Sequence, residues 1–246
     1  MSDTKPSLGP EATAFVEQAK KDAAKAFRVL RETRTISASG TVGFTQRIPG
    51  EEILVNLGYA GPWGDDLDEV RVSVVGFDGT VYVGNARAAG AGRYTALFRK
   101  HPDVTTISHV HTPYLGAFAQ AHSTHPFLYV PVQRHRFVRE LPVYIDRRQA
   151  EVDFILDQLK RDAEIPGIIE ANGGATVWGK KGLLALADFI LLLEEGAQFQ
   201  ILAGALGGSR QLGPGVLQQQ WRMSGLIPAD AVVEQDGKIH YAEAAE

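Results

Sequence analysis

The chain has 246 residues and a formal net charge of −4; 44% of its residues are hydrophobic and 22% are charged. This composition is typical of a globular protein with a full core, and the acidic balance argues against nucleic-acid binding, which needs a concentrated basic face. The chain contains no cysteine, which excludes disulfides, thiolate metal ligands and cysteine nucleophiles. Any metal must therefore be bound by histidine, carboxylate, amide or water.

The two ends of the chain are predicted to lie outside the folded domain. Residues 1–10 are polar and lack the apolar core of a signal peptide, so we expect a flexible tail there. No apolar run approaches the roughly 18 residues that a membrane helix needs. We therefore expect a cytoplasmic protein without a membrane partner, with one domain over residues 11–225 and a polar C-terminal extension over residues 226–246.

The first half of the chain alternates helices and strands. Apolar residues at helical spacing after Pro10 predict a helix over residues 11–32. Arg47-Ile-Pro-Gly50 is typical of a turn, and the β-branched runs on either side of Asp78-Gly79 predict a hairpin. The predicted strands are 53–55, 70–75, 80–83 and 104–111, and the predicted helices are 94–100 and 115–122.

The second half continues in the same way. The predicted strands are 127–132, 141–144 and 167–178, the last broken at Gly173-Gly174, and the predicted helices are 147–161, 183–206 and 217–223. Interleaved strands and helices together with a hairpin indicate a mixed sheet covered by helices.

The strand predicted at 104–111 contains a possible metal-binding pair, His109 and His111. Residues i and i+2 on a strand point to the same side, so both imidazoles can reach one ion at roughly 2.0–2.1 Å. Neutral imidazole suits zinc, iron or manganese. Taken alone, such a pair also recurs by chance, as two core or surface histidines.

The segment Ser108-His-Val-His-Thr-Pro-Tyr114, followed by Ala117, Ala119 and Ala121, resembles the metal motif of the class II aldolase/adducin family. The similarity extends in order from about Phe27 to Leu206. It includes Ser39-Gly-Thr41, Arg47-Ile-Pro-Gly50, Phe77-Asp-Gly79, Pro102-Asp-Val104 and Trp178-Gly179. The resemblance implies a single α/β/α domain with a central mixed, largely antiparallel sheet. It also implies a divalent metal and a homotetramer with active sites at subunit interfaces.

Two positions depart from the pattern of that family. The family's third histidine falls on Gly173, and its catalytic glutamate falls on Gly90. The stretch from Gly79 to Pro102 contains no Asp or Glu at all. The resemblance therefore implies an altered site that lacks one metal ligand and the aldolase proton shuttle.

A rebuilt metal site needs a replacement ligand. His135 is the first candidate, because its segment runs beside the active site in the family, although it is also typical of a surface histidine among basic residues. Glu170 is the second, since it would complete a two-histidine-one-carboxylate set; on a regular strand, however, it faces away from Gly173. His125 is third, with a turn-capping role as the alternative. Arg134 and Arg139 are candidates to pair with a substrate carboxylate, or belong to a solvated or subunit-contact surface.

Three functions remain open from the sequence. The first is a non-haem Fe(II) oxygenase or oxidative decarboxylase of an aromatic 2-oxo or 2-hydroxy acid. It rests on the similarity of Val130-Pro-Val-Gln-Arg-His135 and Glu170-Ala-Asn-Gly-Gly174 to the family branch that oxidises prenylated 4-hydroxyphenylpyruvate in aminocoumarin pathways. The alternatives are a zinc- or manganese-dependent lyase (aldolase or decarboxylase) and a non-catalytic, adducin-like interaction protein. Both enzyme readings predict a small-molecule substrate.

Overall fold

The computed structural model describes residues 6–64, 66, 69–85, 92–134, 139–233 and 239–241. Its helices are α1 (Pro10–Glu32), α2 (Thr95–Lys100), α3 (Pro113–Gln120), α4 (Val130–Gln133), α5 (Glu151–Arg161), α6 (Leu183–Ala203) and α7 (Pro214–Met223). Its strands are β1 (Val42–Arg47), β2 (Ile53–Tyr59), β3 (Val70–Gly76), β4 (Val81–Val83), β5 (Thr106–Val110), β6 (His125–Pro126), β7 (Glu140–Leu141), β8 (Val143–Tyr144), β9 (Gly167–Glu170), β10 (Ala175–Gly179), β11 (Ala231–Val233) and β12 (Ile239–Tyr241).

A central eight-stranded sheet organises the domain, in the order β4-β3-β2-β1-β5-β10-β9-β8. The pair β8–β9 is parallel and the other described pairs of this sheet are antiparallel. The predicted α/β class with a mixed, largely antiparallel sheet is confirmed. The hairpin predicted around Asp78-Gly79 is also confirmed, as β3 and β4.

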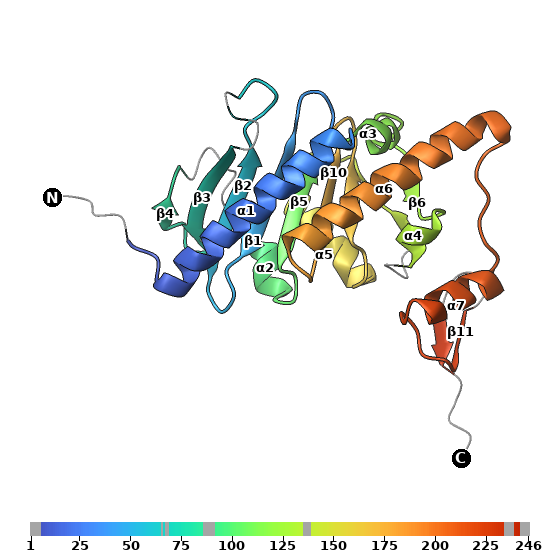
Figure 1. Ribbon diagram of the computed structural model, residues 1–246. Coiled ribbons are helices and arrows are strands. Elements are labelled where there is room, and N and C mark those ends of the chain that lie inside the picture. The colour runs from blue at the N-terminus through green and yellow to red at the C-terminus, as the bar shows by residue number, and fades with distance from the viewer. Residues whose placement is uncertain are drawn as a thin grey trace, which may run out of the picture.

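Helices α1 and α6 run across one face of this sheet (Figure 1). Alternate strand residues point toward them, as when Phe44 of β1 stacks on Phe27 of α1 with ring centroids 5.6 Å apart. The intervening residues of β1 and β5, among them Gly43 and His109, point to the opposite face. Helices α2 and α5, which contact each other, bring further side chains to that opposite face.

Strand β5 occupies the middle of the sheet, between β1 and β10. Its residue His109 lies opposite Gly43 on one side and Thr176 on the other. The chain then enters α3, whose first free amides, at Tyr114 and Leu115, donate to the buried carboxylate of Glu194 at 2.7 and 2.8 Å. Helix α6 therefore fixes the start of α3, the helix that follows the predicted metal-binding strand in the chain.

The C-terminal segment has a small core of its own, formed by Leu217, Trp221, Ile227 and Ala231. The indole of Trp221 donates to the carbonyl of Gln133 at 2.9 Å, which attaches this segment to α4. The small core spans the boundary that the sequence predicts between residues 225 and 226. The domain limits 11–225 and 226–246 remain a prediction.

Three predicted elements are corrected by the structure. Residues 127–132 are not a strand, because Pro131 cannot donate to a sheet but suits the first turn of α4. The helix predicted from 147 begins at Glu151, which leaves Arg147 in the preceding turn. The strand predicted over 167–178 is the antiparallel pair β9 and β10, joined by a turn in which Asn172 has a φ of 57°.

Helix α6 corrects the expectation about apolar runs. With the 3-10 turn that follows it, it forms a segment, Leu183–Leu206, that is long and apolar enough by length and composition to cross a membrane. It packs against α1, α3, α4, β5 and β10, and its buried face includes Leu193 and the carboxylate of Glu194. These contacts bury one face of α6, and 33% of its apolar window lies inside the structure.

His125 belongs to the core rather than to an open site. It is 1% exposed and lies between the rings of Phe118 and Phe127, with ring centroids 5.0 and 5.9 Å away. Its Nδ1 atom has no hydrogen-bond partner. Burial lowers the pKa of His125 to about 4.

This buried histidine predicts a loss of stability in mild acid. Because its pKa in the folded state is below the value of about 6.5 in the unfolded chain, the unfolded chain alone takes up the proton between these two pH values. We expect His125 to lower the free energy of unfolding by about 2 kcal/mol between pH 7 and pH 5. Denaturant unfolding at both pH values measures this loss.

The variant His125→Phe should lose this part of the pH dependence. The control is His122→Asn, at an exposed histidine whose φ of 51° asparagine tolerates, and it should keep the wild-type dependence. An unchanged pH dependence in His125→Phe would show that this residue is not responsible.

Candidate metal centre

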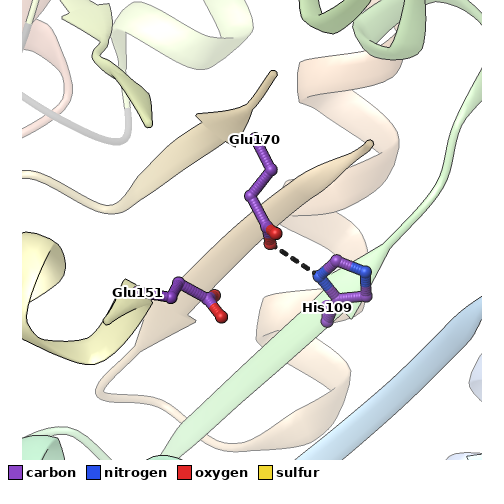
Figure 2. Close-up of side chains that lie close together, drawn as sticks. All are labelled: His109, Glu151 and Glu170. Atoms are coloured by element: carbon purple, nitrogen blue, oxygen red, sulfur yellow. Dashed lines mark hydrogen bonds and ion pairs between the residues drawn. The ribbon is translucent and has the colours of Figure 1, made fainter. Parts of the chain in front are cut away.

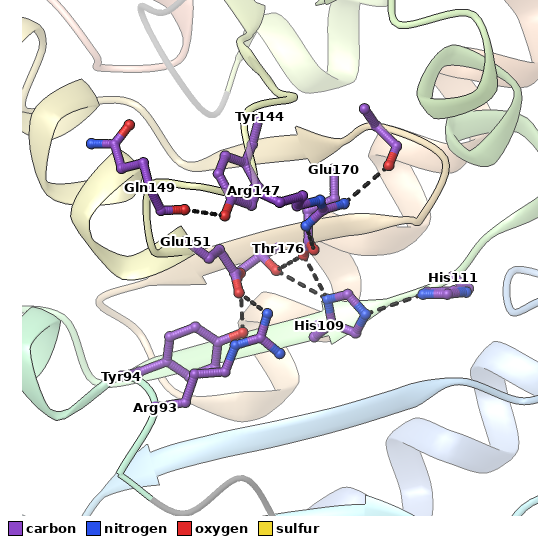
Figure 3. Close-up of polar contacts among 11 residues, drawn as sticks. Arg93, Tyr94, His109, His111, Tyr144, Arg147, Gln149, Glu151, Glu170 and Thr176 are labelled. Carbon is purple, nitrogen blue, oxygen red and sulfur yellow. Dashed lines mark hydrogen bonds and ion pairs between the residues drawn. The ribbon is translucent and has the colours of Figure 1, made fainter.

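The imidazole of His109 is oriented by a buried hydrogen-bond network (Figure 3). Its Nδ1 atom lies 2.8 Å from Oε1 of Glu170 and 3.1 Å from Oγ1 of Thr176. Thr176 donates its one hydroxyl proton to the same carboxylate at 2.6 Å. Since Glu170 accepts both bonds, Nδ1 of His109 carries a proton, and Nε2 is the nitrogen left to hydrogen-bond His111 or to bind a metal.

The free nitrogen of His109 faces the second histidine. The two Nε2 atoms of His109 and His111 lie 3.1 Å apart. Two nitrogens bound to one tetrahedral zinc, each at roughly 2.0–2.1 Å, lie about 3.4 Å apart, so this pair fits a shared ion. Burial, and then the neighbouring His109, lower the pKa of His111. His111 is therefore neutral at neutral pH, which is the form that binds metal.

Glu170 is the residue that holds this network together. It is 4% exposed. Burial acts to raise its pKa, but hydrogen bonds from His109, Thr176 and Arg147 outweigh burial and lower it to about 2. Glu170 is thus ionised at neutral pH and available as the acceptor for the Nδ1 proton of His109.

A second buried carboxylate, Glu151, reaches the same place from the start of α5 (Figure 2). It accepts a hydrogen bond from the hydroxyl of Tyr94 at 3.2 Å and forms an ion pair with Arg93. Burial raises the pKa of Tyr94 to about 12, so its phenol stays protonated. Ligand atoms of His109, Glu151 and Glu170 all lie within 4.8 Å of one another, which makes these three another possible metal-binding group.

The guanidinium of Arg147 closes the other side of Glu170. It donates to Oε2 of Glu170 at 3.3 Å and to the carbonyl of Ala171 at 3.0 Å. It also lies over the ring of Tyr144, 4.6 Å from its centroid. These contacts hold the side chain in place although it is 51% exposed.

A cavity of about 520 Å³ opens beside His109, over strands β1, β2 and β3. Gly43 and Gly58 lie opposite each other in its floor, in line with His109. A Cβ atom on either glycine would meet no atom closer than 3.4 Å, so the fold does not require glycine for space there. The polar lining includes Thr45, Asn56, Arg71, Ser73 and Arg93.

The structure brings together three of the residues selected from the sequence: His109, His111 and Glu170. His135 and Gly90 lie outside the described residues. Arg134 and Arg139 instead donate to Gln220 and Gln211 in the C-terminal part of the chain.

Sequence reasoning missed four residues of the site, namely Tyr94, Arg147, Glu151 and Thr176. The one signal for Arg147 in the sequence was its place at the end of a run of arginines, which are Arg134, Arg136, Arg139, Arg147 and Arg148. Thr176 could have been predicted, because alternate residues of a strand face the same side of the sheet, and Thr176 lies opposite His109 on the neighbouring strand.

Comparison with protein families identifies the class of protein. Residues 21–201 match the family described as "Class II Aldolase and Adducin N-terminal domain". The match covers most of the chain and includes His109 of β5 and His111, which follows the end of that strand. The chain therefore belongs to the class II aldolase and adducin family, as the sequence resemblance predicted. A search of curated proteins finds no match.

Solved structures show the same fold. An L-fuculose 1-phosphate aldolase matches with a TM-score of 0.65 and 16% identity, over 84% of this chain and 95% of the other. The L-fuculose 1-phosphate aldolase from Glaciozyma antarctica PI12 matches with a TM-score of 0.64 and 19% identity, over 89% and 86%. YgbL from Escherichia coli, described as a candidate aldolase/epimerase/decarboxylase, matches with a TM-score of 0.62 and 20% identity, over 85% and 99%.

The role of Glu170 predicts a specific loss in Glu170→Gln. An uncharged amide accepts the Nδ1–H bond of His109 more weakly, so zinc affinity should fall roughly 10- to 100-fold. Isothermal titration of the metal-free protein with zinc measures this change. The control Glu195→Gln alters a carboxylate that bonds Tyr129 instead, and it should bind zinc like the wild type. Equal affinity in both variants would contradict the role of Glu170.

Proposed function

We propose that this protein is a metal-dependent lyase that cleaves a carbon–carbon bond in a small hydroxylated oxo acid. The observation that carries the proposal is the imidazole pair of His109 and His111, with Nε2 atoms 3.1 Å apart and the first ring fixed by the ionised Glu170. Membership of the class II aldolase and adducin family supports it. Two of the similar solved structures are also aldolases.

His109 and His111 are the residues that would hold the metal, with zinc or manganese favoured. A bound divalent ion supplies positive charge beside a substrate carbonyl and so stabilises the negative charge that develops during cleavage. Glu170 has the supporting role, since its oxygens are already engaged by His109, Thr176 and Arg147. His135 keeps its predicted role as a third ligand.

The cavity beside His109 offers polar groups that a small hydroxylated acid could bind. Its described walls present hydroxyl, amide and guanidinium groups, which are the partners of hydroxyl and carboxylate groups. The paired glycines in the floor give a substrate close access to the backbone of β1 and β2. Apolar side chains, among them Val42, Leu57 and Ile107, line the rest of the cavity.

Proton transfer requires a group other than the family's glutamate, whose position is Gly90. We assign it to Glu151, the buried carboxylate that shares the face of the sheet with His109. Tyr94 donates to it, and Arg93 pairs with it. A carboxylate held in this way is suited to accept and return a proton during cleavage.

An iron-dependent oxygenase or oxidative decarboxylase of an aromatic 2-oxo or 2-hydroxy acid is the second candidate. The observation that favours it is the meeting of His109, His111 and Glu170, which is the composition of two-histidine-one-carboxylate iron sites. The hydrogen bond between Glu170 and Nδ1 of His109 favours the lyase instead, because it engages the carboxylate that such an iron site would use as a ligand. A non-catalytic, adducin-like role would require neither metal nor substrate.

A homotetramer in the cytoplasm accords with this proposal. Apolar side chains toward the end of α6 and just beyond it are exposed in the single chain, namely Phe199, Ile201, Leu202 and Leu206. Large exposed apolar patches are typical of subunit interfaces, and these four side chains are our candidates for one. Arg134 and Arg139 lie outside the network around His109 and remain candidates for binding a substrate carboxylate across such an interface.

To test the activity, bound metal is first removed with a chelator. Separate samples are then loaded with zinc, with manganese, and with iron under anaerobic conditions. Each form is incubated with 4-hydroxy-2-oxo acids, and the products of retro-aldol cleavage, pyruvate and an aldehyde, are quantified. We expect cleavage with zinc or manganese and none after chelation, and loss of at least 100-fold in a His109→Ala, His111→Ala double variant.

Three outcomes would contradict the lyase proposal. Oxygen uptake with an aromatic 2-oxo acid in the iron form, without anaerobic cleavage, would establish the oxygenase. Zinc or manganese binding without cleavage of any hydroxy-oxo acid would leave the lyase proposal wrong. Failure of the wild type to bind any of the three metals would favour the non-catalytic role.

The assignment of Glu151 predicts a separation of metal binding from turnover. In Glu151→Gln we expect turnover to fall roughly 10²- to 10⁴-fold, because the amide cannot accept a proton. Zinc affinity should stay at the wild-type value, which titration calorimetry measures. A matching loss of zinc affinity would instead make Glu151 a metal ligand, within the group that it forms with His109 and Glu170.

A further inference from the structure

We propose that Arg147 binds the carboxylate of the substrate, and that it makes the site selective for an acid over a neutral analogue. The inference rests on the proposed function, because it assigns a residue to the substrate of that same site. Nothing in the sequence motif indicates this role, since Arg147 precedes α5 and lies 23 residues from Glu170.

The first argument is the position of the guanidinium relative to the histidine pair. One carboxylate, Glu170, bonds His109 through Oε1 and Arg147 through Oε2. The guanidinium is therefore separated from the oriented imidazole by a single side chain. Figure 3 shows Arg147 and His109 on the two sides of Glu170. In this proposal, a small acid bound at the Nε2 atoms of the histidines extends its carboxylate past Glu170 to reach this cation.

The second argument is that the guanidinium is both fixed and accessible. Glu170, the carbonyl of Ala171 and the ring of Tyr144 hold it in one orientation, yet half of the side chain is exposed. A planar guanidinium held in this way presents its remaining N–H groups as a preorganised fork for a carboxylate.

The third argument is the glycine beside it. A Cβ atom on Gly173 would lie 3.9 Å from Nη2 of Arg147 and 3.3 Å from the carbonyl of Glu170. Any longer side chain at position 173 would therefore crowd the guanidinium. Gly173, which stands where the family has a metal-binding histidine, leaves that side of Arg147 open. A substrate can therefore approach the guanidinium from there.

The neighbouring Arg148 provides a matched control. It is 91% exposed and forms its ion pair with Asp146 rather than with Glu170. Removing its charge changes the net charge of the protein as much as removing that of Arg147. The two variants therefore separate a specific contact from a general electrostatic effect.

The experiment compares the binding of pyruvate and its neutral amide, pyruvamide, to the zinc-loaded protein by titration calorimetry. We expect the wild type to bind pyruvate more tightly than pyruvamide. Arg147→Gln should reduce this preference about 10- to 100-fold and leave pyruvamide and zinc affinity unchanged. Arg147→Lys should restore part of the preference, and Arg148→Gln should keep all of it.

Several results would overturn the proposal. These are a wild type that binds pyruvate no better than pyruvamide, a wild type that binds neither, and an Arg147→Gln variant that loses both ligands equally. The last would show that Arg147 only supports Glu170. Because binding is measured without turnover, an intact preference in a protein that cleaves no hydroxy-oxo acid would contradict the proposed function alone.

Discussion

The hydrogen bond between Glu170 and Nδ1 of His109 is the contact on which the rest of the site depends. It determines which nitrogen of His109 carries the proton, and so which nitrogen is free to face His111. Burying a carboxylate is unfavourable unless it is well bonded, and here three donors outweigh that cost. The same carboxylate positions Arg147, so one buried side chain orients both the imidazole pair and the cation beside it.

The sheet supplies the geometry that makes this contact possible. Strand β5 has neighbours on both sides, which holds its backbone in a regular register. On one side Thr176 adds its hydroxyl to the network, and on the other Gly43 leaves open space above the sheet. His109 therefore has hydrogen-bond partners on the β10 side and the cavity on the β1 side. Glu194 then fixes α3 directly after His111.

Much of the fold followed from the sequence because its signals are local. The β-branched residues around the histidine pair, the Asp78-Gly79 turn and the long apolar helix each specify their own structure. The prediction of a strand at 127–132 was wrong because the β-branched residues there were weighted above Pro131, which favours the start of a helix. A short apolar run such as residues 127–132 is compatible with either a buried strand or a helix start.

The site was less predictable because its parts meet only in three dimensions. His109 and His111 could be paired because residues i and i+2 of the predicted strand 104–111 share a face, although β5 itself ends at Val110. Glu170 was selected as a ligand, but its hydrogen bond to Nδ1 indicates a supporting role that spacing does not reveal, since 61 residues separate it from His109. Glu151 and Arg93, 58 residues apart, pair only after α5 packs against α2. No sequence motif joins these residues.

The most direct test of this account is to locate the metal by anomalous X-ray diffraction from crystals of the zinc-loaded protein. The account predicts one anomalous peak within bonding distance of Nε2 of both His109 and His111, with Glu170 still bonded to Nδ1 of His109. A peak among His109, Glu151 and Glu170, or no peak at the histidine pair, would contradict it.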